Sequence, residues 1–382
     1  MEVWPDTHLD TVTTRTICRD ILRAVNSEEP LADRSESWST SITTDIRFVR
    51  TVQRMSTVYV IATGGTIAST SSDTGTVPTE SVQELVQAYP ESFEHVDIEL
   101  EQLTQTPSSE LTIDDLVTLS DRVRAVADDV DGIVVLHGTD TIEETAYYLD
   151  LVLDVDIPVV LTGAQRPYDS RSPDGPANLR GALAAASHDH VRTGAYVFFN
   201  DRLHAARPVT KDHSSNLDAY GSGNYGPVAD RTPNGLWFYR RPESLSVTIP
   251  TRDITATVEV VPTSTGTDGR QIAHAVDCGV DGIVVDALGL GNVPTSVADS
   301  IGDAVDDDVV VVITSRCHNG VVSPVYGSKG GGAVLEEEGV LFASNLPAHK
   351  ARIKLLVALS QQSGDTVLEA FDSSQIDGHG YV

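Results

Sequence analysis

Two threonines flank a pair of glycines in the segment ATGGTIAST (62–70), which follows a short apolar run typical of a strand. Gly64 and Gly65 allow the backbone to turn sharply and to approach a ligand closely. Main-chain amides in such a turn can stabilise a developing oxyanion, and Thr63 and Thr66 place hydroxyl groups beside them. The segment lacks the GxGxxG spacing of a dinucleotide site. Taken alone, it is equally consistent with a glycine turn capped by threonines.

A second candidate lies in HGTDTIEET (137–145), where a buried strand is expected to lead into a helix. Open α/β sheets bind ligands at this edge. Thr141 and Glu144 have the spacing of a helix capping box, which is a purely structural role. Thr139 and Asp140 precede that cap, so their hydroxyl and carboxylate remain available. We interpret the segment as a candidate site for an amide substrate.

Lys211, in RPVTKDH (207–213), is one of only four lysines in the chain and follows a predicted buried strand. A buried lysine amine can accept the proton of a neighbouring hydroxyl. The alternative is an ordinary surface lysine whose stem packs on the protein. Because lysine is scarce in this sequence, a catalytic role is the hypothesis that we carry forward.

Metal ligation has weaker support. His188, Asp189 and His190 form one short cluster, and Cys317 and His318 form another. Neither has the spacing of a metal site, so surface or core positions are the simpler interpretation. We expect no metal and no other cofactor.

These segments are set in an alternation of predicted strands and helices. The strands are β-branched runs that are apolar on both faces, which is typical of a buried parallel sheet. We expect strands at 58–62, 132–138, 158–164 and 195–200, and helices at 81–89, 113–127 and 142–153. The pattern predicts an α/β fold, with a larger N-terminal parallel-sheet domain carrying helices on both faces and a smaller C-terminal α/β domain.

Domain boundaries are expected where this pattern changes. Residues 1–54 show no strand-like alternation, and we expect a disordered extension or an upstream start codon assigned in error, with a tethering arm as the alternative. The N-terminal catalytic domain is expected at 55–228, and a linker rich in Pro and Arg at 229–254. The C-terminal domain is expected at 255–382, with strands near 255–261, 282–288 and 309–315 and a last helix at 348–361.

The composition bears on partners and compartment. The 382 residues include 56 acids against 26 Lys and Arg, a net charge of −30, and Asp outnumbers Glu 37 to 19. This charge argues against nucleic acid and anionic membranes as partners. An Asp-rich, Lys-poor surface suits concentrated salt, where the Debye length falls to ~3 Å. Three cysteines without a CxxC, and an N-terminus without signal-peptide regions, predict a cytoplasmic protein.

Together, several motifs resemble the bacterial-type L-asparaginase/glutaminase family. They occur in the family's order and approximate spacing, and the resemblance covers essentially residues 56–382. The motifs are TGGTIA (63–68), HGTDT (137–141), TGAQRP (162–167), DGPANL (174–179), the VTK of 209–211, NYGP (224–227) and LPAHKAR (346–352).

The resemblance implies a threonine-dependent amidohydrolase. By similarity, Thr66 is the nucleophile that attacks the side-chain carboxamide; an acyl-enzyme forms, ammonia leaves, and water releases aspartate. Thr139, Asp140 and Lys211 resemble the family's second catalytic set, in which the lysine polarises the threonine. Asp140 would orient that threonine and bind the substrate ammonium. No cofactor is implied.

The resemblance also implies substrate contacts and assembly. Ser108 resembles the serine that binds the substrate α-carboxylate, and Ser109 follows it. Ala164 resembles the residue whose carbonyl holds the leaving amide nitrogen. Asn292, in GLGN (289–292), resembles a loop that reaches a neighbouring protomer's site. The family forms homodimers or homotetramers, so a homo-oligomer is implied.

One departure from the family concerns the loop after TGGTIA. Many members carry a tyrosine there, whereas STSSDTGTVPT (69–79) contains none. Thr74 or Thr76 substitutes, another residue performs the task, or activity is reduced.

Two other functions compete with the hydrolase. The glutaminase component of an archaeal Glu-tRNA amidotransferase shares this core, but it carries an additional N-terminal β-domain that residues 1–54 are too short to supply. A catalytically dead amino-acid sensor is disfavoured because the four catalytic-type residues are retained together. Asparagine and glutamine differ by one methylene, worth only ~1–3 kcal/mol, so the sequence does not separate them.

Overall fold

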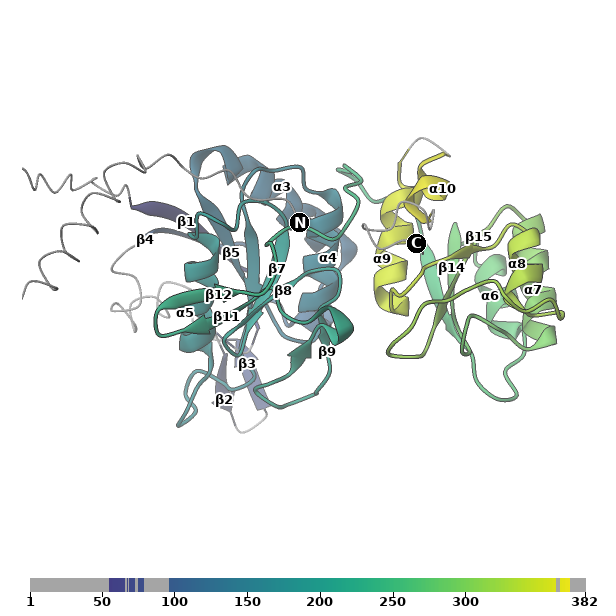
Figure 1. Ribbon diagram of the computed structural model, residues 1–382, viewed down its shortest axis with the longest axis horizontal. Helices are drawn as coiled ribbons and strands as arrows, with labels where there is room; N and C mark the ends of the chain where they lie inside the picture. The colour runs from purple at the N-terminus through teal and green to yellow at the C-terminus, as the bar shows by residue number, and fades with distance from the viewer. Residues whose placement is uncertain are drawn as a thin grey trace, which may run out of the picture. The chain divides into compact units, whose positions relative to one another are not determined.

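The computed structural model describes residues 55–65, 67, 69–72, 75–78, 96–361 and 365–371. The expected extension at 1–54 and the expected helix at 81–89 lie outside the described residues. In the part that is described, the chain forms a large mixed sheet and a smaller parallel sheet, each with its own helices (Figure 1). This confirms the predicted fold class.

Eight strands form the larger sheet, in the order β12-β11-β8-β7-β6-β5-β1-β4. Their bounds are β1 (Ser56–Ala62), β4 (Val96–Gln102), β5 (Gly132–Leu136), β6 (Val159–Thr162), β7 (Ala195–Phe199), β8 (Arg202–Ala205), β11 (Ala229–Thr232) and β12 (Gly235–Phe238). Strands β4, β1, β5, β6 and β7 are parallel, so their carboxyl ends meet at one edge. Two short hairpins lie outside this sheet: β2 (Ser69–Ser72) with β3 (Gly75–Pro78), and β9 (Thr210–Lys211) with β10 (Tyr220–Gly221).

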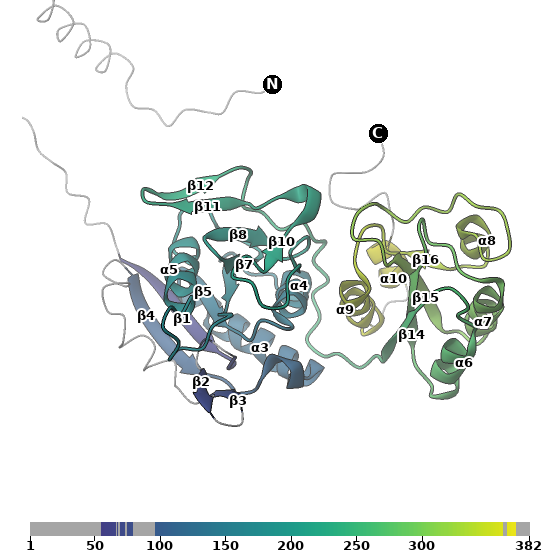
Figure 2. The same cartoon turned by 90° about the horizontal axis from the view of Figure 1, so that it is seen from below.

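Helices cover both faces of the parallel core because its strands are apolar on both faces. Helices α3 (Ile113–Val126) and α4 (Ile142–Val152) lie on one face of the sheet and α5 (Gly175–Ala186) on the other (Figure 2). Tyr59 and Ile61 of β1 pack with α3 and α4, whereas Val58 and Val60 pack with α5. β5 is buried along its whole length. Short 3-10 turns complete the connections: η3 (Ser108–Glu110), η4 (Ala127–Asp129) and η5 (Gly223–Tyr225).

The first part of the segment expected as a linker at 229–254 forms two strands. β11 pairs antiparallel with β8, and β12 pairs antiparallel with β11, so residues 229–238 extend the large sheet. The physical reason is the tight turn Pro233–Asn234 between β11 and β12, after which Gly235 begins β12 with a φ of +114°. Proline, asparagine and glycine in succession (233–235) are typical of a tight turn, and the proline and arginine content of the segment obscured this signal.

The smaller sheet contains β13 (Val258–Pro262), β14 (Gly282–Ala287), β15 (Val310–Ser315) and β16 (Leu341–Phe342), all parallel. Its helices are α6 (Arg270–Asp277), α7 (Thr295–Asp306), α8 (Gly332–Glu337), α9 (Ala348–Leu359) and α10 (Asp365–Phe371). Helix α9 packs on β14 and also on α4 of the larger domain, so one helix contacts both domains. Among the described residues, no helix has the length and apolar character needed to cross a membrane.

Candidate active site

The loops that follow β1 and β5 touch at the carboxyl edge of the large sheet. A Cβ placed on Gly65, whose φ is +94°, would lie 2.5 Å from Gly138 Cα. A Cβ on Gly138 would in turn lie 2.5 Å from Ser108 Oγ. Glycine is therefore required at both positions for this close approach. Thr66, the expected nucleophile, lies outside the described residues, although its neighbours Gly65 and Ile67 are described.

Lys211 joins the two polar residues that follow β5. Its Nζ donates to Thr139 Oγ1 at 2.9 Å and to Asp140 Oδ1 at 2.7 Å. The lysine side chain is 13% exposed and the aspartate side chain 68% exposed, so the carboxylate faces solvent while the amine lies beneath it. The structure thus brings Lys211 together with two residues that lie 72 and 71 positions before it in the chain.

Two further side chains bond the main chain of Thr139 and Lys211. The Tyr220 hydroxyl donates to the main-chain oxygen of Thr139 at 2.5 Å. Burial, followed by the charges of Glu143 and Asp140, raises the pKa of the Tyr220 phenol, so this group remains a neutral donor. Glu143 accepts the main-chain N–H of Lys211 at 3.0 Å. Neither role was predictable from the sequence, because these contacts join segments that are distant in the chain.

The capping box predicted from Thr141 and Glu144 is not present in the structure. The Thr141 side chain makes no cap hydrogen bond on α4; its hydroxyl instead donates to the Ser108 carbonyl oxygen at 2.8 Å. Ser108 Oγ accepts the Asp140 main-chain N–H at 3.2 Å. The reason is that the Thr141 hydroxyl is engaged by the Ser108 carbonyl of another segment. Ser108 therefore ties its own turn to the loop that carries Thr139 and Asp140, and its hydroxyl proton remains available to a substrate oxygen.

The other candidate binding residues, Ala164, Ser109 and Asn292, lie in three different segments. Ala164 is buried in the loop after β6, and a Cβ on the preceding Gly163 would lie 3.4 Å from Thr139 Cγ2. Ser109 is exposed beside Ser108. Asn292 belongs to the smaller domain, where its main chain pairs with Leu288. Within the described residues, no hydrogen bond or ion pair joins Ser109, Ala164 or Asn292 to Lys211, Thr139 or Asp140.

His137 fixes the start of the same loop. It is fully buried, and this burial lowers its pKa to about 4 against the opposing effect of its bond to Gly138. The imidazole is therefore neutral at pH 7. Since a carbonyl oxygen only accepts, Nδ1–H donates to Gly138 O at 2.7 Å, and Nε2 accepts from the Thr145 hydroxyl at 2.9 Å. One ring nitrogen thus bonds the loop and the other bonds helix α4, so both are occupied by structural hydrogen bonds.

Comparison with models of protein families identifies the family of this chain. Residues 57–244 match the family model for the asparaginase N-terminal domain, and residues 257–371 match that for the glutaminase/asparaginase C-terminal domain. The chain belongs to the asparaginase family. It is therefore a hydrolase that acts on an amide.

Relatives of the chain include L-asparaginases and an amidotransferase component. It is 39% identical to a probable L-asparaginase of Deinococcus radiodurans, over 79% of this chain and 92% of the relative. It is 35% identical to an L-asparaginase of Bacillus licheniformis, over 79% of this chain and 95% of that protein. It is also 31% identical to one component of the glutamyl-tRNA(Gln) amidotransferase of Methanobrevibacter smithii, over 80% of this chain and 72% of that protein.

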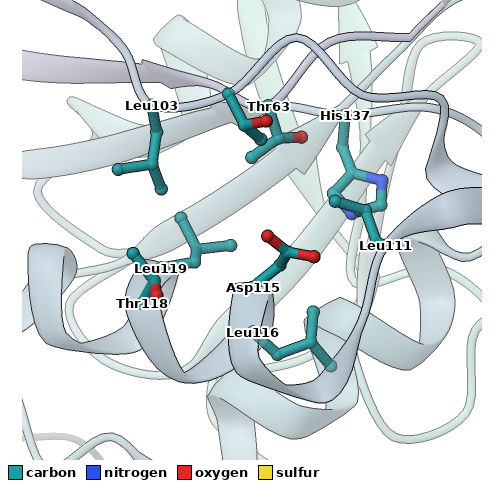
Figure 3. A pocket seen from close by; sticks show the side chains of 9 residues that line it. Thr63, Leu103, Leu111, Asp115, Leu116, Thr118, Leu119 and His137 are labelled. Carbon is teal, nitrogen blue, oxygen red and sulfur yellow. The ribbon is translucent and has the colours of Figure 1, made fainter.

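Two hollows lie near these candidate residues in the part of the chain that the structure describes. The first, about 50 Å³, is lined by Thr63, Asp115 and His137 among others, behind the sheet edge (Figure 3). It has room for a few water molecules and is too small for an amino acid. The second is a cleft of about 750 Å³ lined in part by Lys211 and by residues of both domains. Of the two, the second is large enough for an amino acid. No cluster of three potential metal ligands occurs among the residues that the structure describes.

Proposed function

We propose that the protein is an L-asparaginase, hydrolysing L-asparagine to L-aspartate and ammonia through a threonine nucleophile. The observation that carries this proposal is the contact of Lys211 Nζ with both Thr139 and Asp140 at the edge where the Gly64–Gly65 loop ends. A hydroxyl that bonds an amine, where the amine also bonds a carboxylate, is a means of proton transfer. The loop beside it carries Thr66.

The chemical steps follow from these groups. Thr66 Oγ1 forms a bond to the carboxamide carbon, and its proton passes to a neighbouring acceptor. The C–N bond breaks, and the departing nitrogen takes up a proton and leaves as ammonia. Water then attacks the ester on Thr66 and releases aspartate. In this scheme Thr139 and Lys211 transfer protons, while the main-chain amides of the glycine loop stabilise the oxyanion.

The charged groups of the substrate are assigned to residues of matching charge or hydrogen-bonding character. The exposed Asp140 carboxylate suits the substrate ammonium. The Ser108 hydroxyl, which keeps its proton available, suits the α-carboxylate. Ser109, Ala164 and Asn292 remain proposed contacts from the family resemblance. The protein is proposed to work in the cytoplasm as a homo-oligomer.

Ammonia release tests the proposal directly. The purified chain is assayed in molar KCl with asparagine and with glutamine in separate reactions, without tRNA or partner proteins. We expect ammonia and aspartate in equal amounts from asparagine. Failure with both amino acids would refute the proposal. Because amidotransferase components are among the relatives, ammonia release that requires tRNA and a second protein would establish that alternative instead.

Salt should control stability and assembly. We propose a salt-adapted protein, since a net charge of −30 favours expansion and dissociation of protomers when screening is removed. We expect the melting temperature and the oligomer size to fall as KCl is lowered from about 3 M to about 0.1 M, because the Debye length grows from ~3 Å or less to ~10 Å. Thermal melts and light scattering measure both quantities. An uncharged osmolyte at matched osmolality is the control, and values that do not change with KCl would contradict the proposal.

A further inference from the structure

Glu143 lies in the first turn of α4, and its carboxylate is enclosed by other elements. The residue is 7% exposed. Its two oxygens have different partners: Oε1 accepts the main-chain N–H of Lys211 at 3.0 Å, and Oε2 accepts from His349 Nε2 at 3.0 Å. Lys350 Nζ lies 3.9 Å from Oε2. One carboxylate therefore joins the proposed catalytic lysine to helix α9 of the smaller domain.

This carboxylate is ionised in the folded protein. Burial opposes its ionisation, but the His349 hydrogen bond and the Lys350 charge outweigh burial and lower the pKa of Glu143 to about 2. Burial also lowers the pKa of Lys350 to about 8, with the nearby Glu143 charge opposing the fall, so the ammonium form is favoured at pH 7. The paired charges keep Glu143 a strong acceptor for the Lys211 amide.

The backbone around Lys211 has little support from sheet structure. β9 is two residues long and pairs with β10, which is equally short. Lys350 supports the approach to β9: its Nζ donates to the carbonyl oxygens of Ala206 and Arg207, at 2.8 and 3.1 Å, and to that of Val209. Helix α9 thus holds the segment before Lys211 through Lys350, and Lys211 itself through Glu143.

We propose that Glu143 is a positioning residue: held by His349 and Lys350 of α9, it fixes the Lys211 main chain so that Nζ meets Thr139 and Asp140. This role rests on the proposed function and extends it to residues that do not contact the substrate. Proton transfer depends steeply on placement, and a displacement of about 1 Å can cost roughly 100-fold in rate.

Kinetics and lysine-selective NMR test the role together. Glu143→Ala should lower kcat by about 10- to 100-fold and leave KM within about threefold, because the substrate contacts remain. Glu143→Gln keeps an acceptor oxygen and should recover most of this loss. Glu144→Gln is the matched control, since it makes the same kind of change at the next residue of α4, which does not bond the Lys211 main chain, and it should keep kcat within about twofold.

The NMR readout requires no turnover. With ¹⁵N-lysine the chain gives one amide peak for each of its four lysines, and Lys211→Arg identifies the Lys211 peak by removing it. In Glu143→Ala that peak should move to higher field, further than those of Lys329 and Lys354. A peak that stays in place, or a kcat equal to that of Glu144→Gln, would overturn the proposal.

If Glu143→Ala does not fold, His349→Ala provides a second test. His349→Ala removes one of the partners that hold Glu143. Because the His349 side chain is 37% exposed, this variant should fold. It should shift the Lys211 peak in the same direction and lower kcat about three- to tenfold. No change in either quantity refutes the positioning role. If the wild-type protein releases no ammonia, the proposed function fails, whereas the Lys211 peak still reports on the bond to Glu143.

Discussion

Lys211→Met should reduce kcat/KM for ammonia release from asparagine by roughly 10³-fold or more, because it removes a proton-transfer group. Methionine keeps most of the side-chain length and loses the amine that bonds Thr139 at 2.9 Å and Asp140 at 2.7 Å. The bond from the Lys211 main chain to Glu143 is unaffected by the substitution. The loss should therefore appear in turnover, with the circular dichroism spectrum unchanged.

Lys329→Met is the matched control for this variant. Lys329 lies in the smaller domain, is 59% exposed, and pairs with Asp299 at the surface. Exposed ion pairs of this kind contribute about 0–1 kcal/mol, so its loss should leave turnover and folding close to wild type. Ammonia release by Lys211→Met at a rate near that of Lys329→Met would remove Lys211 from the mechanism.

The parallel core was predictable from the sequence because burial on both faces leaves a strong local signal. The runs at 132–138 and 195–200 contain apolar residues on both sides of the strand, and they correspond to β5 and β7. The mixed character of the sheet was not predicted. The strands β8, β11 and β12 are four residues each, and only β12 alternates in exposure along its length. A tertiary pairing, rather than local composition, makes them part of the sheet.

The site was predictable to the extent that its residues follow strands. Thr139 and Asp140 follow β5, and Ser108 precedes α3, so topology alone brings them toward one edge. The partners of these residues were not predictable. Thr141 bonds Ser108 across 33 positions, and Glu143 bonds His349 across 206. Spacing rules such as the capping box apply within one helix, and they fail where another segment offers a nearer partner.

Thr66→Ala should abolish turnover, with a loss of several orders of magnitude, because no other group would form the acyl-enzyme. The expectation rests on the family membership and on the contact of Gly65 with the loop that carries Thr139. Thr139→Ala should also be severely impaired, but for a different reason: the nucleophile remains and its proton acceptor is weakened. Rapid quenching and mass spectrometry of the intact chain separate the two cases.

A covalent adduct should form slowly in Thr139→Ala and not at all in Thr66→Ala, since the ester requires the Thr66 oxygen. Thr63→Val is the matched control in the same loop. The Thr63 hydroxyl donates to Leu136 O at 3.1 Å, and that oxygen also accepts the Thr63 main-chain N–H at 2.9 Å, so it keeps a partner in the variant. Its loss should cost about 1 kcal/mol of stability and little turnover. An adduct on Thr66→Ala, mapped by peptide mass to Thr139, would reverse the roles of the two threonines.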